Sequence, residues 1–342
     1  MLTLWQVGRL AAHTELDRNL ISAVQRNDSQ EVALLLHQGA NANARISYAE
    51  LYGFLTTLFY RLSGSRVSPN RYVTPMEMAA SINYRKRNTV AADTRIIEAL
   101  LDAGARPNDH ESDDYTPLAH AAYIGDLSAV QTLVRHGADV KQRFMQGQTA
   151  LHVAGSDKVA EFLVESGADV SAVNDDGFAP LIYSEAKGDI ARVKLLVRLG
   201  VHLNVLDNEG YTPLIHAAHK GNVEMVKALI AGGARVDMHD KYGLTALHWA
   251  AHFGKPDVIK ALASAGADPN AIYQDGFTPL IGAANDGNAA VVQALLEVGA
   301  NPKLKTKEGY NAEAYARSYG IKANPEDGRR ILLLLRQQQS GP

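Results

Sequence analysis

Histidine and aromatic side chains recur at regular spacing in the second half of this 342-residue sequence. His216 and His219 lie three residues apart, and His252 follows 33 residues after His219. Residues three apart share one face of a helix, so the first pair could bind a metal ion. The chain has no cysteine and no clear carboxylate completes the set, so we expect no metal and no cofactor. Histidines that make binding depend on pH near 6.5 are the alternative.

Catalytic motifs are absent from the sequence. It contains no nucleophile elbow, no glycine-rich phosphate loop, no zinc-protease helix and no kinase set. Nearly every residue belongs to a repeated pattern, which leaves no room for a separate catalytic domain. We therefore predict no catalytic residues and no enzyme.

The charges of the chain nearly cancel, with 34 Lys and Arg against 37 Asp and Glu. Nucleic-acid binding requires a dominant positive field, so nucleic acid is not expected as the main partner. No apolar run approaches the roughly 18 residues of a membrane span, and the N-terminus lacks a continuous apolar core of signal-peptide length. We expect a cytoplasmic protein that is a monomer when unbound, with secretion by an unrecognised signal left open.

Glycines that end predicted helices return at a nearly constant interval. The four intervals between Gly167 and Gly299 are each 33 residues long. A glycine there suits the left-handed end of a helix. A second series lies upstream, as in Thr212-Pro213-Leu214, where Thr can cap a helix and Pro is tolerated at its first position. Each unit is therefore predicted to be a turn, a short helix, a tight turn and a second helix.

Two segments carry a family resemblance. They are Thr245-Ala246-Leu247-His248-Trp249-Ala250-Ala251 and Gly266-Ala267-Asp268-Pro269-Asn270. They resemble the ankyrin repeat, whose pattern combines Thr-Pro-Leu-His, paired Ala and a terminal Gly-Ala-Asp. The resemblance extends over residues 17 to 320. It implies an all-α ankyrin-repeat solenoid of about eight repeats plus terminal caps.

The predicted organisation is a single domain over residues 1–342. A helix at 1–16 precedes the repeats, which occupy 17–306, and 307–342 form a C-terminal cap. The repeat at 145–174 is three residues short, so either its first helix is cut or its inter-helix turn is shortened.

Two insertions interrupt the pattern near the second repeat. The first, at 46–72, carries apolar residues at helical spacing and predicts an extra inserted helix between repeats 1 and 2. This amphipathic helix either folds back on its own repeats or contacts a partner through Tyr52 and Phe54.

The second insertion, at 81–93, is basic. It carries Arg85, Lys86 and Arg87. It is either a solvated loop or a basic site for an acidic partner surface or a phosphate group.

The family resemblance also implies which side chains line the binding groove. They are the residue before the paired Ala of each repeat and the residues three and four positions later on the same helical face. The predicted partner-binding residues in this register are Tyr123, Tyr183, His216, His219, Lys220, Trp249, His252 and Phe253.

Trp249 and Phe253 are the strongest of these predictions, because equivalent positions in other repeats hold His, Lys, Asp or Gly and packing does not fix them. His152 and His248 occupy the motif's own histidine position and are expected to be structural. We predict a scaffold or adaptor that binds a protein through the groove. An inhibitor or immunity protein that neutralises a toxin or enzyme, and a secreted effector that captures a host protein, are the alternatives.

Overall fold

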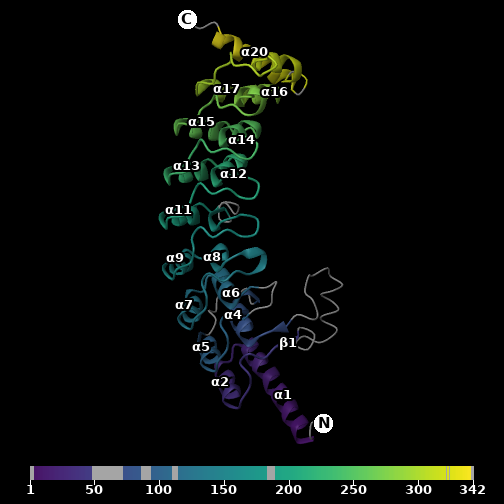
Figure 1. The fold of residues 1–342 in the computed structure, drawn as a ribbon, viewed down its shortest axis with the longest axis vertical. Helices are drawn as coiled ribbons and strands as arrows, with labels where there is room; N and C mark the ends of the chain where they lie inside the picture. Colours follow the sequence, from purple (N-terminus) through teal and green to yellow (C-terminus); the bar gives the residue numbers. More distant parts are fainter. Residues whose placement is uncertain are drawn as a thin grey trace. The chain divides into compact units, whose positions relative to one another are not determined.

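The computed structural model describes residues 4–47, 72–85, 94–109, 115–182, 189–320, 322 and 324–339. In these residues the chain is mainly helical and the helices come in pairs (Figure 1), which confirms the predicted all-α fold. The chain divides into two compact units, Met1–Asp175 and Asp176–Pro342. A single domain over 1–342 stays a prediction. No helix in the described ranges is both long enough and apolar enough to cross a membrane.

In its described residues, the first unit has four helix pairs and one short strand pair. Its elements are α1 (Leu4–Arg26), α2 (Ser29–His37), β1 (Ile46–Ser47), β2 (Tyr72–Val73), α4 (Pro75–Arg85), α5 (Thr94–Asp102), α6 (Pro117–Ile124), α7 (Leu127–Arg135), the 3-10 turn η1 (Met145–Gly147), α8 (Ala150–Val153) and α9 (Asp157–Glu165).

A short antiparallel ladder closes the base of the first insertion. Ile46 pairs with Val73, and Ser47 pairs with Tyr72. The two ends of the 46–72 insertion are therefore held together, so the insertion leaves and rejoins the helix pairs at one point. The helix predicted within it, with Tyr52 and Phe54, lies outside the described residues.

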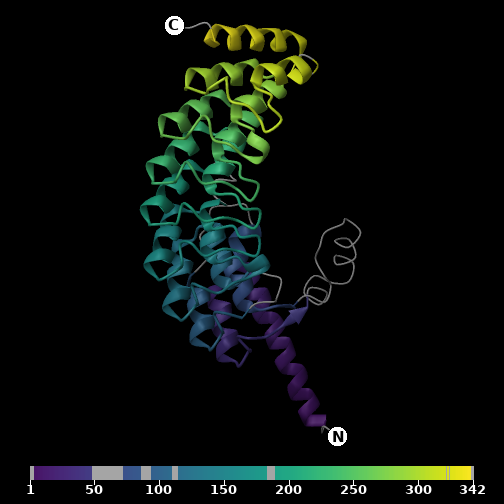
Figure 2. The ribbon, with the colours of Figure 1, turned by 45° about the horizontal axis from the view of Figure 1, so that its top comes forward.

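The N-terminal segment differs from its prediction. One continuous helix, α1, replaces the separate helix expected at 1–16 and the first helix of the first repeat (purple in Figure 2). No proline interrupts this stretch, so nothing in the backbone chemistry ends the helix early. It ends where Asn27 takes a left-handed φ of 60°. Its last turns are buried through Leu20 and Val24.

The second unit continues the pattern of paired helices. Its elements are α11 (Ile190–Arg198), α12 (Pro213–Lys220), α13 (Val223–Ala231), α14 (Ala246–His252), α15 (Pro256–Ser264), the 3-10 turn η2 (Gln274–Gly276), α16 (Pro279–Asn285), α17 (Ala289–Glu297), α18 (Ala312–Tyr315), the π-helical turn η3 (Ala316–Gly320) and α20 (Pro325–Gln339). Figure 1 shows α12, α14 and α16 stacked in one column and α11, α13, α15 and α17 in the other. We call the first column the inner helices and the second the outer helices.

Local chemistry explains why each pair folds as it does. The Thr212 hydroxyl accepts a hydrogen bond from the Ile215 N–H at 3.2 Å, which caps α12, and Pro213 occupies its first turn. Gly221 then ends α12 with a φ of 79°. Asn222 follows at once and caps α13 by accepting a hydrogen bond from the Met225 N–H at 3.1 Å. The chain therefore reverses direction within two residues, and the apolar faces of both helices are buried.

The shortened repeat loses residues from its first helix. α8 contains only Ala150–Val153, whereas α9 keeps nine residues. After α8 the backbone packs directly on the preceding repeat, where the Gly155 N–H donates to the Ala122 carbonyl at 2.7 Å. A Cβ at Gly155 would lie 2.2 Å from the Tyr123 carbonyl oxygen, so glycine is required there. Of the two alternatives for this repeat, the structure has the cut helix.

The C-terminal helix α20 covers the last complete pair. It packs on α17, and Ile331 and Leu335 on its inner face are fully buried. Leu333, on the opposite face, is exposed. An amphipathic helix of this kind shields the end of a stacked array from water.

The histidine of the repeat motif has a structural role. In the second unit, the Nδ1 atom of His248 accepts hydrogen bonds from the Thr245 N–H at 3.2 Å and the Thr245 hydroxyl at 2.9 Å. Burial lowers the pKa of His248 from 6.5 to about 4, against a smaller opposing effect of the Ala271 backbone. The buried ring is therefore neutral at pH 7. His152 makes the same contacts with Thr149 in the first unit.

The lowered pKa predicts acid destabilisation. The unfolded chain binds a proton at His248 near pH 6.5, whereas the folded chain binds it near pH 4. The free energy of unfolding must fall as the pH drops between these values, by about 3 kcal/mol in all. Urea unfolding of the wild type and of His248→Gln between pH 7 and pH 4 measures this. We expect the variant to be less stable at pH 7 and to show a shallower pH dependence; equal slopes would contradict the assignment.

Candidate functional site

An aromatic cluster forms where α12 and α14 pack side by side. It consists of Tyr211, His216, His219, Trp249, His252 and Phe253, and we refer to it below as the aromatic cluster. The His219 ring lies 4.1 Å from the Phe253 ring between centroids, and the Phe253 ring stacks on Trp249 at 5.7 Å and 9°. The structure therefore brings together five of the predicted site residues. Phe253 remains 41% exposed, so the cluster presents an apolar surface to solvent.

Trp249 is held in place by the turn of its own repeat. The buried Asp240 carboxylate accepts hydrogen bonds from the Tyr242 and Leu244 N–H groups through Oδ1, at 2.8 and 2.9 Å. Its Oδ2 accepts one from the Trp249 Nε1–H at 3.0 Å. Tyr211 packs edge-on against the indole at 5.3 Å. One carboxylate therefore orients both the turn and the indole, which was not predicted from the sequence.

His216 has the same arrangement one repeat earlier. Asp207 Oδ1 accepts from the Glu209 and Tyr211 N–H groups at 2.9 and 2.8 Å, and its Oδ2 accepts from His216 Nε2–H at 2.7 Å. In both repeats the carboxylate lies nine residues before the ring that it orients. The signal is visible in the sequence as an acidic residue that recurs with the 33-residue period, but sequence reasoning did not use it.

The next repeat breaks this rule. The position equivalent to Trp249 is Gly282, and the position equivalent to Asp240 is Tyr273. A Cβ at Gly282 would meet no atom within 4 Å. The missing side chain leaves a cavity of about 240 Å³ beside the aromatic cluster, which we call the Gly282 cavity. It is lined by Leu244, His248, Trp249, Ala251, His252, Tyr273, Thr278, Pro279, Gly282 and Asp286.

Charge changes sign across the cluster. At one side, the pKa of His219 is lowered first by burial and then by its neighbours His216, Lys220 and Lys255. At the other side, His252 Nδ1 lies 3.2 Å from Asp286 Oδ2, on the edge of the Gly282 cavity. The surface therefore runs from basic side chains on α12 to a single carboxylate, Asp286, at the C-terminal end of α16. Over the described ranges, no group of three or more His, Cys, Asp or Glu side chains could hold a metal ion.

The other predicted site residues are not part of this cluster. Tyr123 belongs to the first unit, where it lies in the last turn of α6, is partly exposed and packs edge-on against Tyr115 at 5.9 Å. Arg85 is the last residue of α4. The predictions for Tyr183, Lys86 and Arg87 fall outside the described residues, as do those for Tyr52 and Phe54.

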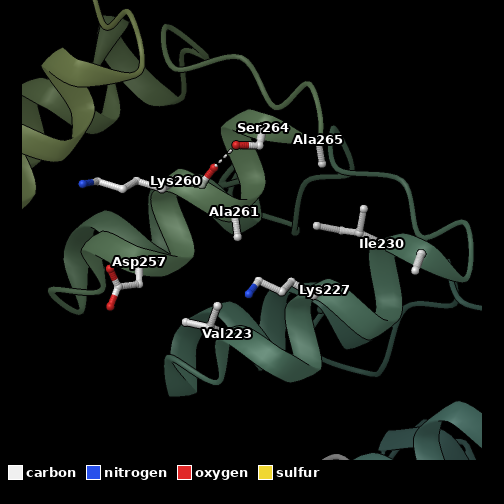
Figure 3. Close-up of a pocket in the computed structure, with 9 residues that line it drawn as sticks. Val223, Lys227, Ile230, Asp257, Lys260, Ala261, Ser264 and Ala265 are labelled. Atoms are coloured by element: carbon white, nitrogen blue, oxygen red, sulfur yellow. Dashed lines mark hydrogen bonds between the residues drawn. The ribbon is translucent and has the colours of Figure 1, made fainter.

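A second hollow lies on the outer helices, between α13 and α15 (Figure 3). It is an open groove of about 800 Å³. Its two lysines are already paired, Lys227 with Glu224 at 3.1 Å and Lys260 with Glu297 at 2.8 Å. No aromatic side chain lines it. The inner face, with its fixed aromatic rings and unequal charge, is therefore the stronger candidate for recognition.

Family profiles match most of the chain. The profile described as ankyrin repeats (3 copies) matches residues 89–174 and 181–273, and the one described as ankyrin repeats (many copies) matches 262–316. These segments contain the described helices from α5 to α18.

Individual relatives match shorter segments. Human protein phosphatase 1 regulatory subunit 27 is 46% identical over 66 residues, which cover 18% of this chain and 43% of that protein. Bovine mitochondrial disaggregase is 28% identical over 185 residues, or 52% of this chain and 22% of the relative. The mouse B-cell lymphoma 3 protein homolog is 35% identical over 114 residues, or 31% and 25%. The chain thus spans less than half the length of each of these relatives.

The backbone at Gly282 predicts a stabilising substitution. Gly282 lies inside α16 and has no positive φ, so alanine fits its conformation and its open surroundings. Gly282→Ala should raise the free energy of unfolding by about 0.5–1 kcal/mol, measured by urea unfolding.

Gly299→Ala is the matched control. Its surroundings are equally open, but its φ is 95°. Alanine there should cost about 1–2 kcal/mol through backbone strain alone. Destabilisation by Gly282→Ala, or a change of the same sign in both variants, would contradict the prediction that helical backbone at Gly282 accepts alanine whereas the positive φ at Gly299 does not.

Proposed function

Because this chain belongs to the ankyrin-repeat family, whose repeats generally mediate protein–protein interaction, we propose that it is a non-enzymatic scaffold or adaptor that holds a protein partner. The contact surface is the aromatic cluster together with Lys220, on the inner helices of the second unit. The single observation that carries this proposal is the pair of hydrogen bonds that orients His216 and Trp249 within the cluster before any partner arrives.

Pre-orientation is what distinguishes this surface from other exposed apolar residues. Binding normally costs free energy because interface side chains lose rotamer freedom. Trp249 and His216 have already lost that freedom on folding, because each is bonded to a buried carboxylate. Large rings with a polar handle are also the side chains that most often dominate interface energies. The cluster therefore has both the composition and the rigidity of a binding centre.

Charge and exposure favour the same surface. Phe253 offers an exposed ring in the cluster, His219 contacts that ring, and Lys220 follows His219 at the end of α12. Such an arrangement suits a partner that places an apolar side chain over Phe253 and an acidic group over α12. The family's relatives include a protein named as a regulatory subunit, which is consistent with a non-enzymatic role. We further propose a cytoplasmic location and a monomer in the unbound state.

The test removes rings that are not needed for folding. Phe253→Ala combined with His219→Ala truncates two exposed side chains of the cluster but leaves the Asp240–Trp249 hydrogen bond intact. Partners are captured from native extract on the immobilised full chain and identified by peptide mass spectrometry. The affinity of the identified partner is then measured. We expect the double variant to lose about 2 kcal/mol of binding, or roughly 30-fold, because truncated hot-spot rings cost that much.

Leu333→Ala serves as the matched control. It removes another exposed apolar side chain of the second unit, on α20, and should leave the partner's affinity unchanged. Thermal unfolding of both variants separates lost contact from lost fold. Full affinity in the Phe253/His219 variant, or equal loss in the control, would contradict the proposal.

A further inference from the structure

The Gly282 cavity has the size of a single side chain. Pockets that hold small-molecule ligands usually measure about 300–1,000 Å³. At about 240 Å³, the Gly282 cavity is smaller than that range. It also exists for a specific reason, since the two preceding repeats fill the same position with His216 and Trp249, each bonded to its own turn. The gap in the series therefore leaves room for a side chain that the chain itself does not supply.

Two large aromatic side chains, Trp249 and Tyr273, contribute to the walls of the cavity. Trp249 forms part of the wall in the orientation fixed by Asp240. Tyr273, which also lines the cavity, occupies the position in this repeat that Asp240 occupies in the preceding one. Aromatic faces attract cations electrostatically, and the attraction grows when water is displaced. A long cationic side chain can also bury its apolar stem against such rings.

One acidic side chain lines the cavity. Asp286 is that residue, and no Lys or Arg is among the lining residues in the described part of the chain. Tyr273 and Asp286 both line the cavity, and the pKa of the Tyr273 hydroxyl is raised by burial first and by the Asp286 charge second. His248, also on the wall, is neutral at pH 7 because burial lowers its pKa to about 4. Among the lining residues, Asp286 is therefore the carboxylate that can attract a cation, and His252 is its existing neighbour.

Asp286 keeps capacity for a further donor. Its Oδ2 lies 3.2 Å from His252 Nδ1, and its Oδ1 accepts a hydrogen bond from Asn285 Nδ2 at 3.2 Å. A carboxylate can accept about four hydrogen bonds, so two of its positions remain. Its side chain is 34% exposed, which leaves it accessible from the cavity mouth.

We infer that the Gly282 cavity binds the cationic side chain of an arginine or lysine residue of the partner protein, with the charge on Asp286 and the stem between Trp249 and Tyr273. This inference rests on the proposed function, because it names the part of the partner that enters the surface next to the aromatic cluster. The basic side of the cluster, over α12, then faces a different and acidic part of the same partner.

The test uses capped amino acids instead of an unidentified partner. The probes are Nα-acetyl-arginine amide, Nα-acetyl-lysine amide and the neutral isostere Nα-acetyl-citrulline amide, titrated into the ¹⁵N-labelled full chain. The readout is the indole N–H resonance of Trp249. The chain has two tryptophans, so the Trp5→Phe variant assigns it. We expect saturable binding of a cationic probe with a Kd on the order of 1 mM, typical of a fragment of this size.

Three variants identify the site. Asp286→Asn should reduce the binding of arginine amide to the level of citrulline amide, which we expect to be at least about five-fold weaker because the charge is absent. Gly282→Leu should fill the cavity and abolish binding of all probes. Asp275→Asn, which changes a carboxylate paired with Lys307 on the nearby turn, should have no effect.

Several results would overturn the inference. They are equal binding of citrulline and arginine amides, undiminished binding to Asp286→Asn, and absence of a saturable shift for both cationic probes. Comparison of the arginine and lysine arms shows which cation fits. Because these probes need no partner, their failure is distinct from that of the proposed function. If the Phe253/His219 variant loses partner binding but the chain does not bind arginine amide, the inference about the Gly282 cavity is wrong and the proposed function stands.

Discussion

A buried carboxylate at the turn connects recognition to folding in this protein. Asp240 uses one oxygen to close the turn and the other to hold the Trp249 indole, and Asp207 does the same with His216. A helix pair buries its apolar face only when the next pair stacks on it, and the turn connects one pair to the next. The ring is rigid because the turn is rigid. Surface rings on this face are therefore oriented by the same contacts that make the array stable.

The side chains on the inner face differ from one repeat to the next where the repeat pattern is interrupted. Identical turns would place an identical ring on every inner helix, and the surface would carry little specificity. Instead, α14 carries Trp249, whereas α16 carries Gly282 and leaves a cavity beside it. Asp286 then adds negative charge on one side, opposite the two histidines and Lys220 of α12. Regular packing supplies the scaffold, and a few departures from it supply the chemistry that a partner could recognise.

Much of this fold could be predicted from the sequence because its signals are local. The Thr212 cap, the Pro213 start and the left-handed Gly221 end each depend on a few neighbouring residues, and the 33-residue period repeats them. The length of α1 could not be predicted, because the resemblance placed a repeat boundary inside a segment that contains no proline. For the short repeat, both a cut helix and a shorter turn fitted the spacing, and the close contact of Gly155 with the Ala122 carbonyl belongs to the first.

The candidate site was predicted less completely. The inner positions of α12 and α14 followed from the register, and His216, His219, Trp249, His252 and Phe253 do lie together. The anchoring of Trp249 was missed, because a hydrogen bond across nine residues depends on the geometry of the folded turn. The Gly282 cavity was missed for a similar reason: a small residue in a series is a gap only when its neighbours are seen to surround an open space.

Hydrogen–deuterium exchange of the full chain, with and without its captured partner, tests the central claim most directly. If the partner binds the inner helices, the backbone amides of α12, α14 and α16 and of the turns that precede them gain the most protection from exchange on binding. Protection concentrated instead on the outer helices α13, α15 and α17 would contradict it, because the partner would then lie on the face that holds no fixed aromatic ring.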